Sequence, residues 1–454
     1  MTLSEYIASL RGKRVAVVGV GVSNLPLLRL LAESGIDVTA HDQHSPEDFG
    51  ADYDALSRQG VKWVLGQRYL DNLDYDLVFR TPGLHPDRLR AGLGEKTVVT
   101  SEMEAFFALC PCRVIAVTGS DGKTTTTTLI SKLLEAEGYT VHLGGNIGKP
   151  LLCELPSFRP EDLAVLELSS FQLHSMVCHP NVAVVTNLSP NHLDVHPDFA
   201  DYANAKKNIF LRQTAADRLV LNADNPHTAA WAGEGKGEVW FFSRRSEPAR
   251  GYFYKDGWIY RNGVRFLERS EILLPGDHNV ENYMAAFAAT DGLVSPESCR
   301  KVARSFPGVE HRIQLVRTLR GVRYYNDSIA SSPTRTVAGL RSFPEKVILI
   351  AGGHDKRVPF DPLAEEIVRR VKALFLVGET AEKIRDAVLA APGYDPAALP
   401  VTVLDDFRET VLAAAAFARE GDTVILSPAC SSFDRFKNFA ERGNTFRRIV
   451  EEME

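Results

Sequence analysis

Short apolar runs alternate with helical patterns over the first hundred residues of the chain. The runs at 15–19, 38–42 and 76–79 predict strands, and apolar side chains recur at helical spacing between Leu25 and Leu31. Strands that alternate with helices are typical of βαβ units around a parallel sheet. The pattern therefore predicts a Rossmann-like domain, which we place at residues 1–104.

The same alternation begins again after residue 112. Val114–Val117 predicts a buried strand that a glycine-rich loop and a helix follow, and further buried strands are expected at 163–166 and 182–185. The predicted helix carries an apolar stripe and then a stop signal: Leu129, Ile130, Leu133, Leu134 and Gly138. These features indicate a second parallel sheet.

The pattern changes in the middle of the chain and again near residue 307. Between 251 and 267, aromatic and polar residues alternate around Asp256-Gly257 and Asn262-Gly263, which are hairpin turn signals. We therefore expect a central P-loop-type domain at 105–306, with a parallel sheet and a small antiparallel sheet. Beyond it, amphipathic helices such as 380–390 separate apolar runs at 347–350, 374–377, 401–404 and 424–426. A Rossmann-like C-terminal domain at 307–454 completes an α/β protein of three domains.

Composition narrows the class of protein. The 454 residues are 44% hydrophobic and 24% charged, close to the average of soluble globular proteins. With 52 Lys and Arg against 58 Asp and Glu, the net charge of −6 gives no basic footprint for nucleic acid, so we expect no nucleic-acid partner. No window approaches 18 uninterrupted apolar residues, and the first residues lack a leader pattern. We expect a cytoplasmic monomer without membrane insertion.

The strongest chemical signal lies between the predicted strand at 114–117 and its helix. Gly119-Ser120-Asp121-Gly122-Lys123-Thr124-Thr125 lacks only the first glycine of the phosphate-loop consensus. Its glycines let backbone N–H groups approach phosphate oxygens, Lys123 brings a positive charge, and the Thr124 hydroxyl suits magnesium. A glycine turn with an exposed lysine is the alternative, but the order strand, loop, helix favours a phosphate site.

Two polar side chains follow neighbouring buried strands. Glu167 ends the run 163–166, and His192 follows the run 182–185. The carboxyl ends of parallel strands are where α/β sites form, so both are candidate ligands for a metal ion that neutralises phosphate charge. Each alone also fits a structural role, the carboxylate as a solvated cap and the histidine as a core residue.

Together these segments resemble the Mur ligases, the ATP-dependent amide ligases that build the peptide stem of peptidoglycan. The resemblance rests on the loop 119–125, on Glu167-Leu168-Ser169-Ser170-Phe171-Gln172-Leu173, and on the segment from Ser427 to Phe439. Matching stretches run from Gly19 to Phe446, across all three predicted domains. Within the family, the motifs most resemble those of the D-glutamate-adding member. Asp121 stands where asparagine is usual, and we expect its carboxylate to point away from phosphate or to cap the helix.

The resemblance implies an activity and its cofactors. It implies addition of D-glutamate to UDP-N-acetylmuramoyl-L-alanine through an acyl phosphate, with ATP and two Mg²⁺ ions. The implied magnesium ligands are Thr124, Glu167, His192 and Lys206, the last as a carbamate formed with carbon dioxide. A bare ammonium would repel the metal, whereas a carbamate supplies oxygen ligands. From the sequence alone, Lys206 is one lysine on a predicted helix face.

The resemblance also assigns the nucleotide site. ATP is expected to contact Gly119, Ser120, Asp121, Gly122, Lys123, Thr124, Thr125, Asn279, Asn282, Arg312 and Asp327. Arg312 joins Lys123, Glu167, His192 and Lys206 as an expected catalytic residue, because a planar guanidinium suits a γ-phosphate.

The substrates have their own implied contacts. These are Val22, Ser23, Gly83 and Asn146 for the UDP-sugar side, and Lys356, Ser432, Phe433 and Phe439 for D-glutamate. Ser169 and Gln172 are also expected to contact substrate. The two phenylalanines fit a plain core role equally well. His44 stands where relatives often place an arginine near the nucleotide. Ile329 replaces a lysine that usually follows Asn-Asp-Ser, so Ser331, Ser332 or another group must compensate.

Three other functions are weighed against the ligase. A folylpolyglutamate synthase shares the loop and the carbamate, but does not need the nucleotide-sugar loop Gly19-Val20-Gly21-Val22-Ser23. A nucleotide-gated binding protein would not need Glu167, His192 and Lys206 together. An NAD dehydrogenase is disfavoured because the G-x-G-x-x-N loop lacks the third glycine of the dinucleotide fingerprint.

Overall fold

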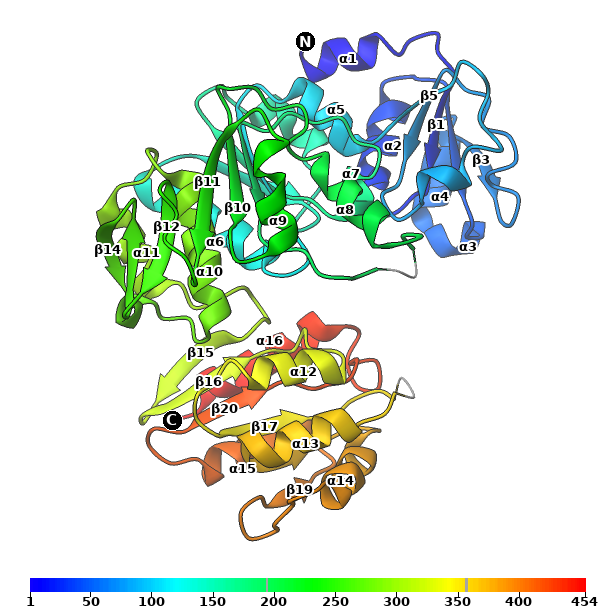
Figure 1. Cartoon of the computed structure of the whole chain (residues 1–454). Coiled ribbons are helices and arrows are strands. Elements are labelled where there is room, and N and C mark those ends of the chain that lie inside the picture. The colour runs from blue at the N-terminus through cyan, green and yellow to red at the C-terminus, as the bar shows by residue number, and fades with distance from the viewer. Residues whose placement is uncertain (193–194, 356–357) are drawn as a thin grey trace. The chain divides into compact units, whose positions relative to one another are not determined.

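The computed structural model describes residues 1–192, 195–355 and 358–454, and its three sheets each lie among helices (Figure 1). The first sheet is parallel, in the order β3-β2-β1-β4-β5, which confirms the predicted Rossmann-like domain. Its strands are β1 Val15–Val18, β2 Val38–Asp42, β3 Lys62–Leu65, β4 Leu77–Arg80 and β5 Val98–Thr100. The helices of this part are α1 Leu3–Ala8, α2 Asn24–Glu33, α3 Pro46–Phe49, α4 Ala51–Arg58, η1 Pro86–Arg88 and α5 Glu102–Leu109.

The second sheet has nine strands, in the order β14-β13-β12-β11-β10-β9-β6-β8-β7. They are β6 Arg113–Thr118, β7 Val141–Gly145, β8 Leu163–Glu167, β9 Val182–Val185, β10 Arg218–Asn222, β11 Glu238–Ser243, β12 Gly251–Lys255, β13 Trp258–Arg261 and β14 Val264–Glu268. The helices are α6 Lys123–Glu137, η2 Leu152–Ser157, α7 Ser170–Leu173, α8 Phe199–Lys207, α9 Pro226–Ala230, η3 Trp231–Gly233, η4 Arg269–Glu271, α10 Asp277–Thr290 and α11 Pro296–Ser305.

The predicted antiparallel strands are present, and they continue the edge of the parallel sheet. Strand β12 pairs parallel with β11, and β12, β13 and β14 then pair antiparallel. Both tight turns have positive φ at their two central residues: 49° and 80° at Asp256-Gly257, and 49° and 83° at Asn262-Gly263. Only Gly, Asn and Asp adopt these angles readily, which is why the sequence marks the turns so clearly.

The third sheet, in the order β15-β16-β20-β17-β18-β19, separates two cores. Alternate strand residues face opposite sides: Leu349 and Ile425 pack in one core with α13 and α14, and Ile350 and Leu426 pack in the other with α15 and α16. The strands are β15 Gln314–Leu319, β16 Val322–Asn326, β17 Val347–Ala351, β18 Val371–Leu376, β19 Val401–Val403 and β20 Thr423–Leu426. The helices are α12 Pro333–Leu340, α13 Asp361–Arg370, α14 Ala381–Ala390, α15 Phe407–Phe417 and α16 Phe439–Glu452.

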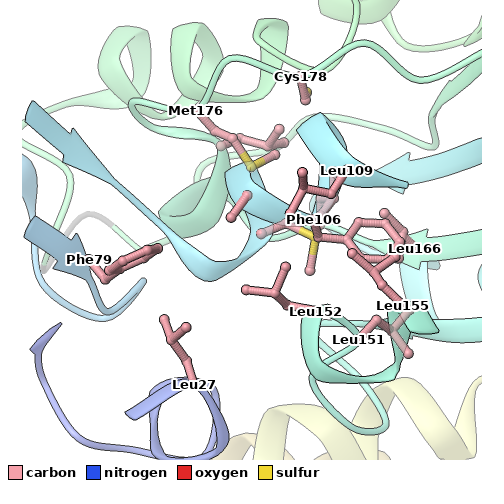
Figure 2. Packing of buried hydrophobic residues seen from close by; sticks show 14 of the residues in the cluster. Leu27, Phe79, Phe106, Leu109, Leu151, Leu152, Leu155, Leu166, Met176 and Cys178 are labelled. Carbon is pink, nitrogen blue, oxygen red and sulfur yellow. The ribbon is translucent and has the colours of Figure 1, made fainter. Parts of the chain in front are cut away.

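The first two sheets belong to one compact unit, residues 1–271 with 281–302, and the third belongs to a second unit, 272–280 with 303–454. One hydrophobic cluster joins the first two: Figure 2 shows Leu27 and Phe79 from the first sheet region, Leu166 from the second, and Phe106 and Leu152 between them. The boundaries placed at 104/105 and 306/307 stay predictions. Within the described residues, no helix is long and apolar enough to cross a membrane.

Candidate active site

The predicted phosphate loop connects β6 to α6. Gly119 and Gly122 have φ of 148° and 77°, and a Cβ would collide with Thr186 Oγ1 at the first and with Asn282 Oδ1 at the second. The Lys123 ammonium donates to the carbonyl oxygens of Gly119 and Ser120, each at 2.9 Å. The loop thus places a lysine and a helix N-terminus together, the arrangement that binds phosphate groups.

Residues that follow β9, and Tyr202 of α8, fix the shape of this loop. Ser120 Oγ lies 2.9 Å from Tyr202 Oη and accepts from the Ser189 N–H at 2.9 Å. The Asn187 amide oxygen accepts from the Asp121 N–H at 2.9 Å. Asp121 itself is exposed, and α6 begins without a side-chain cap. Of the two expectations for Asp121, pointing outward therefore fits and capping does not.

Lys206 is buried against the phosphate loop and is only 1% exposed, whereas its neighbour Lys207 on the same helix is half-buried. Its Nζ donates to the Gly119 carbonyl at 2.8 Å and to Thr118 Oγ1 at 3.3 Å. Burial lowers the pKa of Lys206 well below its ordinary value, and the charge of Lys123 lowers it further, against the opposing effect of Glu167. Burial therefore favours the neutral amine of Lys206 over the charged form.

Glu167 lies at the carboxyl end of β8 and is 2% exposed. Its Oε1 accepts from the Asn146 side-chain amide at 2.8 Å, and the Asn146 N–H donates to the Glu167 carbonyl at 2.7 Å. Its Oε2 is buried and has no hydrogen-bond partner among the described residues. A buried carboxylate oxygen in this state is suited to a hard cation.

The remaining predicted metal ligands lie near these groups. His192 is exposed, has φ of 56°, and meets the Phe171 ring edge-on with 5.0 Å between centroids. Thr124 is partly buried in the first turn of α6. The structure thus brings together the loop, Glu167 and Lys206. His192 lies beside α7, because its ring contacts Phe171 of that helix.

The other predicted nucleotide contacts of this unit adjoin the loop. Thr125 is buried in the first turn of α6, and Asn282 Oδ1 accepts from Thr126 Oγ1 at 3.2 Å.

The predicted substrate contacts Ser169 and Gln172 bond to each other. Ser169 caps α7 through a reciprocal pair of hydrogen bonds with Gln172. Ser169 and Gln172 therefore shape the start of α7, whatever else they contact.

The predicted UDP-sugar residues follow the first strands of the first sheet. Val22 is 81% exposed, unusual for valine, and Ser23 is next to it in the loop after β1. Gly83 lies in the loop after β4, the strand that pairs in parallel with β1. His44 is paired with Asp42, Nδ1 to Oδ1 at 2.7 Å, and the other oxygen of Asp42 accepts from the Val20 N–H at 2.6 Å. The His44 ring thus helps to orient the carboxylate that shapes the glycine loop.

The second unit carries the predicted Asn279, Arg312 and Asp327. Asp327 is buried; its carboxylate accepts from Ser427 Oγ at 2.7 Å and from the Ile313 N–H at 3.2 Å, and burial raises its pKa to about 7. Arg312 Nε is buried without a hydrogen-bond partner among the described residues. The Asn279 amide donates to the Pro275 carbonyl at 2.6 Å.

The structure describes three of the four predicted D-glutamate contacts. Ser432 is buried, whereas Phe433 and Phe439 are 68% and 40% exposed, so the plain core interpretation of these phenylalanines is wrong. Lys356 lies outside the described residues. Arg335 Nη1 donates to the carbonyl of Ile329 at 3.3 Å, which puts a positive charge next to the backbone of the residue that replaces the lysine.

Two buried arginines were not singled out from the sequence. Arg80 donates to the carbonyls of Leu84 and Phe171 and to Ser175 Oγ, and so fixes the loop that carries Gly83. Arg442 donates to the carbonyls of Ser328, Cys430 and Ser431, and burial lowers its pKa to about 10. Nothing local in the sequence distinguishes either residue from a surface arginine, because some of the partners that bury them are distant in the chain: Phe171 and Ser175 for Arg80, and Ser328 for Arg442.

Two family models and full-length relatives match this chain. Residues 117–290 match the family model "Mur ligase middle domain", and residues 311–430 match "Mur ligase, glutamate ligase domain". The chain is 50% identical to the UDP-N-acetylmuramoylalanine–D-glutamate ligase of Acetivibrio thermocellus, covering 100% of this chain and 99% of that one. It is 49% identical to the protein of the same name from Clostridium botulinum, covering 97% of each.

Solved structures share the fold at much lower identity. UDP-N-acetylmuramate-alanine ligase from Thermotoga maritima has a TM-score of 0.58 at 18% identity, covering 97% of this chain and 98% of that one. MurF ligase from the same organism, solved in complex with ADP, has a TM-score of 0.57 at 16% identity, covering 91% and 95%. These structures support the three-domain α/β arrangement.

Proposed function

Because the chain belongs to the Mur ligase family, we propose that it joins D-glutamate to UDP-N-acetylmuramoyl-L-alanine with consumption of ATP. The observation that carries this proposal is the position of Lys206, whose buried amine donates to the carbonyl of the phosphate-loop residue Gly119. A protein that only binds nucleotide needs the loop but gains nothing from burying a lysine there. A ligase gains a group that carbon dioxide can convert into a metal ligand.

In the proposed reaction, the carboxylate of the L-alanyl group attacks the γ-phosphorus of ATP. The bond from that phosphorus to the β–γ bridging oxygen breaks, ADP leaves, and an acyl phosphate remains. The amine of D-glutamate then attacks the acyl carbon, the bond to the phosphate oxygen breaks, and the nitrogen loses a proton as the amide forms. Lys123, and Arg312 in the second unit, are proposed to offset the charge on the phosphate oxygens.

Magnesium fits the groups around the phosphate loop. Glu167 offers a buried oxygen without a hydrogen-bond partner among the described residues, and such an oxygen is stabilised by a divalent cation. We propose Thr124, Glu167, His192 and carbamylated Lys206 as ligands at two sites. When bound, magnesium would neutralise charge on the phosphate oxygens during transfer.

D-Glutamate is proposed to bind in the second unit through Lys356, Ser432, Phe433 and Phe439. Exposed phenylalanines support this role, because large apolar side chains that do not pack in a core are typical of binding surfaces. Arg335 is proposed to supply the positive charge that Ile329 does not, since it already donates to the Ile329 carbonyl.

An amino-acid panel tests this function. With ATP, Mg²⁺ and UDP-N-acetylmuramoyl-L-alanine, we expect phosphate release with D-glutamate to exceed release with L-glutamate, L-lysine or diaminopimelate by at least about 100-fold, since the amine and both carboxylates must be positioned together. Mixtures that omit either substrate are the controls. Preference for another amino acid, or release with a folate and L-glutamate, would refute the assignment.

A further inference from the structure

Three histidines surround one carboxylate where the loop after β4 meets α7 and α8. His174 Nε2 lies 3.0 Å from Asp201 Oδ1, and His85 Nε2 lies 3.9 Å from Asp201 Oδ2. The rings of His85 and His174 are 4.3 Å apart between centroids. Side-chain exposure is 12% for His85, 17% for His174 and 28% for Asp201. The cluster is therefore partly buried and open to a small ion.

The hydrogen bonds of His85 leave one nitrogen unsatisfied. Its Nδ1 accepts from the Asp87 N–H at 3.3 Å, so in the neutral ring the proton is on Nε2. That Nε2 is buried and has no hydrogen-bond partner among the described residues. A buried polar atom in this state costs free energy, and a bound cation would remove the cost once the proton moves to Nδ1.

We propose that His85, His174 and Asp201 bind one divalent transition-metal ion, Zn²⁺ in the first place. Their donor atoms all lie within 4.8 Å of one another. Zinc binds nitrogen and oxygen ligands at about 2.1 Å, so two ligand atoms in a tetrahedral site stand about 3.4 Å apart. The distance from Asp201 to His174 Nε2, 3.0 Å, is slightly shorter than this value, and the distance from Asp201 to His85 Nε2, 3.9 Å, is slightly longer. Water completes the coordination.

Outer contacts would hold the ligands in place. His196 Nδ1 lies 2.6 Å from Asp201 Oδ2, and His196 Nε2 lies 3.0 Å from Ser170 Oγ, which orients the carboxylate. Asp87 Oδ2 stands 3.6 Å from His85 Nδ1, where it would accept the relocated proton. Carboxylates behind histidine ligands are a regular feature of metal sites.

The site is distinct from the one proposed for magnesium. None of its three ligands belongs to that set, and two imidazoles with one carboxylate select zinc or cobalt over magnesium, which prefers oxygen. In the part of the chain that the structure describes, no other group of three or more His, Cys, Asp or Glu side chains brings its donor atoms this close.

A bound ion would tie together parts of the two neighbouring sheets. His85 follows Gly83 by two residues, in the loop after β4 of the first sheet, while His174 and Asp201 belong to the end of α7 and to α8 of the second. The ion would thus fix the loop that is predicted to contact the UDP-sugar substrate. Its role is structural, and it takes no part in phosphate transfer.

Cobalt reports the coordination of such a site directly. Protein freed of metal by chelation is titrated with Co²⁺ in buffer with excess Mg²⁺, and visible absorption is recorded. We expect one equivalent to give the intense bands of four- or five-coordinate cobalt, and Zn²⁺ to displace it. His85→Asn keeps a group near Nδ1 but removes Nε2, and His174→Gln keeps a hydrogen bond to Asp201. Each should weaken binding by at least about 100-fold.

Matched variants separate this site from others. His179→Asn removes a histidine that also pairs with a carboxylate, Asp217, at 2.7 Å, and it should leave the bands unchanged. The free thiols of Cys110 and Cys112 lie 3.5 Å apart and are another possible binding place for cobalt. Glu167→Gln and Cys112→Ser should leave the bands unchanged as well. No band in the wild type, a band that survives in His85→Asn and His174→Gln, or a band lost in Glu167→Gln or Cys112→Ser would overturn the proposal.

Anomalous diffraction removes any dependence on the folding of the variants. Wild-type crystals soaked in ZnCl₂ are measured at the zinc edge. We expect a peak among His85, His174 and Asp201. Zinc peaks that lie only elsewhere, or none at all, would contradict the site.

Discussion

Replacement of Lys123 by alanine is expected to lower kcat for phosphate release by about 1000-fold, because the lysine is the charged group that the loop holds at the N-terminus of α6. The negative charge that spreads over the phosphate oxygens during transfer would lose its fixed counter-charge. Phosphate and ADP release with both substrates and ATP at saturation measure the effect.

Lys132→Ala is the matched control. Lys132 is on the same helix, but it is exposed and pairs with Glu135 at 2.7 Å, so kcat should change less than twofold. Both variants should melt within a few degrees of the wild type, since Lys123 is partly exposed and Lys132 is exposed. A Lys123→Ala protein that retains more than a tenth of wild-type kcat would show that the loop does not take part in catalysis.

Replacement of Lys206 by alanine is expected to have the second large effect, a loss of activity of about 100- to 1000-fold. Carbon dioxide reacts only with a neutral amine, and the pKa of Lys206 is lowered first by burial and then by Lys123. At a given pH a larger fraction of Lys206 is therefore neutral amine than of an exposed lysine, and that fraction falls as pH falls through the lowered pKa. Wild-type activity should fall in buffer stripped of carbon dioxide and return with bicarbonate.

Lys207→Ala controls for the loss of a lysine from the same helix. The ammonium of the half-buried Lys207 pairs with Glu234 at 2.7 Å, so its loss should leave both activity and the bicarbonate response intact. Lys206→Ala should show no bicarbonate response. If wild-type activity is the same with and without carbon dioxide, while carbon-13 NMR finds no carbamate, then Lys206 is an unmodified lysine.

The strands that the sequence predicted best are those buried on both faces. Val15–Val18 and Val182–Val185 are continuous apolar runs because helices or neighbouring chain segments cover both sides of each strand. Strand β3, Lys62–Leu65, gave no such signal: it is at the edge of its sheet, and its residues alternate between exposed and partly buried. Edge strands keep polar residues, so a search for apolar runs misses them.

The phosphate loop could be predicted because its chemistry is local. Glycines, lysine and threonine must follow one another between a strand and a helix, so seven consecutive residues carry the signal. The environment of Lys206 could not be predicted from the sequence, because it depends on Thr118 and Gly119, which are almost ninety residues away in the chain. Only the family resemblance marked that lysine.

The cluster of His85, His174 and Asp201 is even harder to predict from the sequence than the environment of Lys206. Its members come from separate loops and helices, and no short spacing pattern of the kind seen in zinc fingers connects them. Arg80 and Arg442 are similar cases, since each is buried through carbonyl groups that the fold alone brings close. Residues whose partners are distant in sequence become visible only when the sheets are assembled.

Transfer of labelled oxygen tests the central claim most directly. The L-alanyl carboxylate of the substrate is labelled with oxygen-18 at both positions, and the inorganic phosphate released during D-glutamate addition is analysed by mass. An acyl phosphate requires that one labelled oxygen leave with phosphate while the other stays in the new amide, so we expect one labelled oxygen in each phosphate. Phosphate without label would show that the carboxylate never attacks ATP, and the proposed reaction would be wrong.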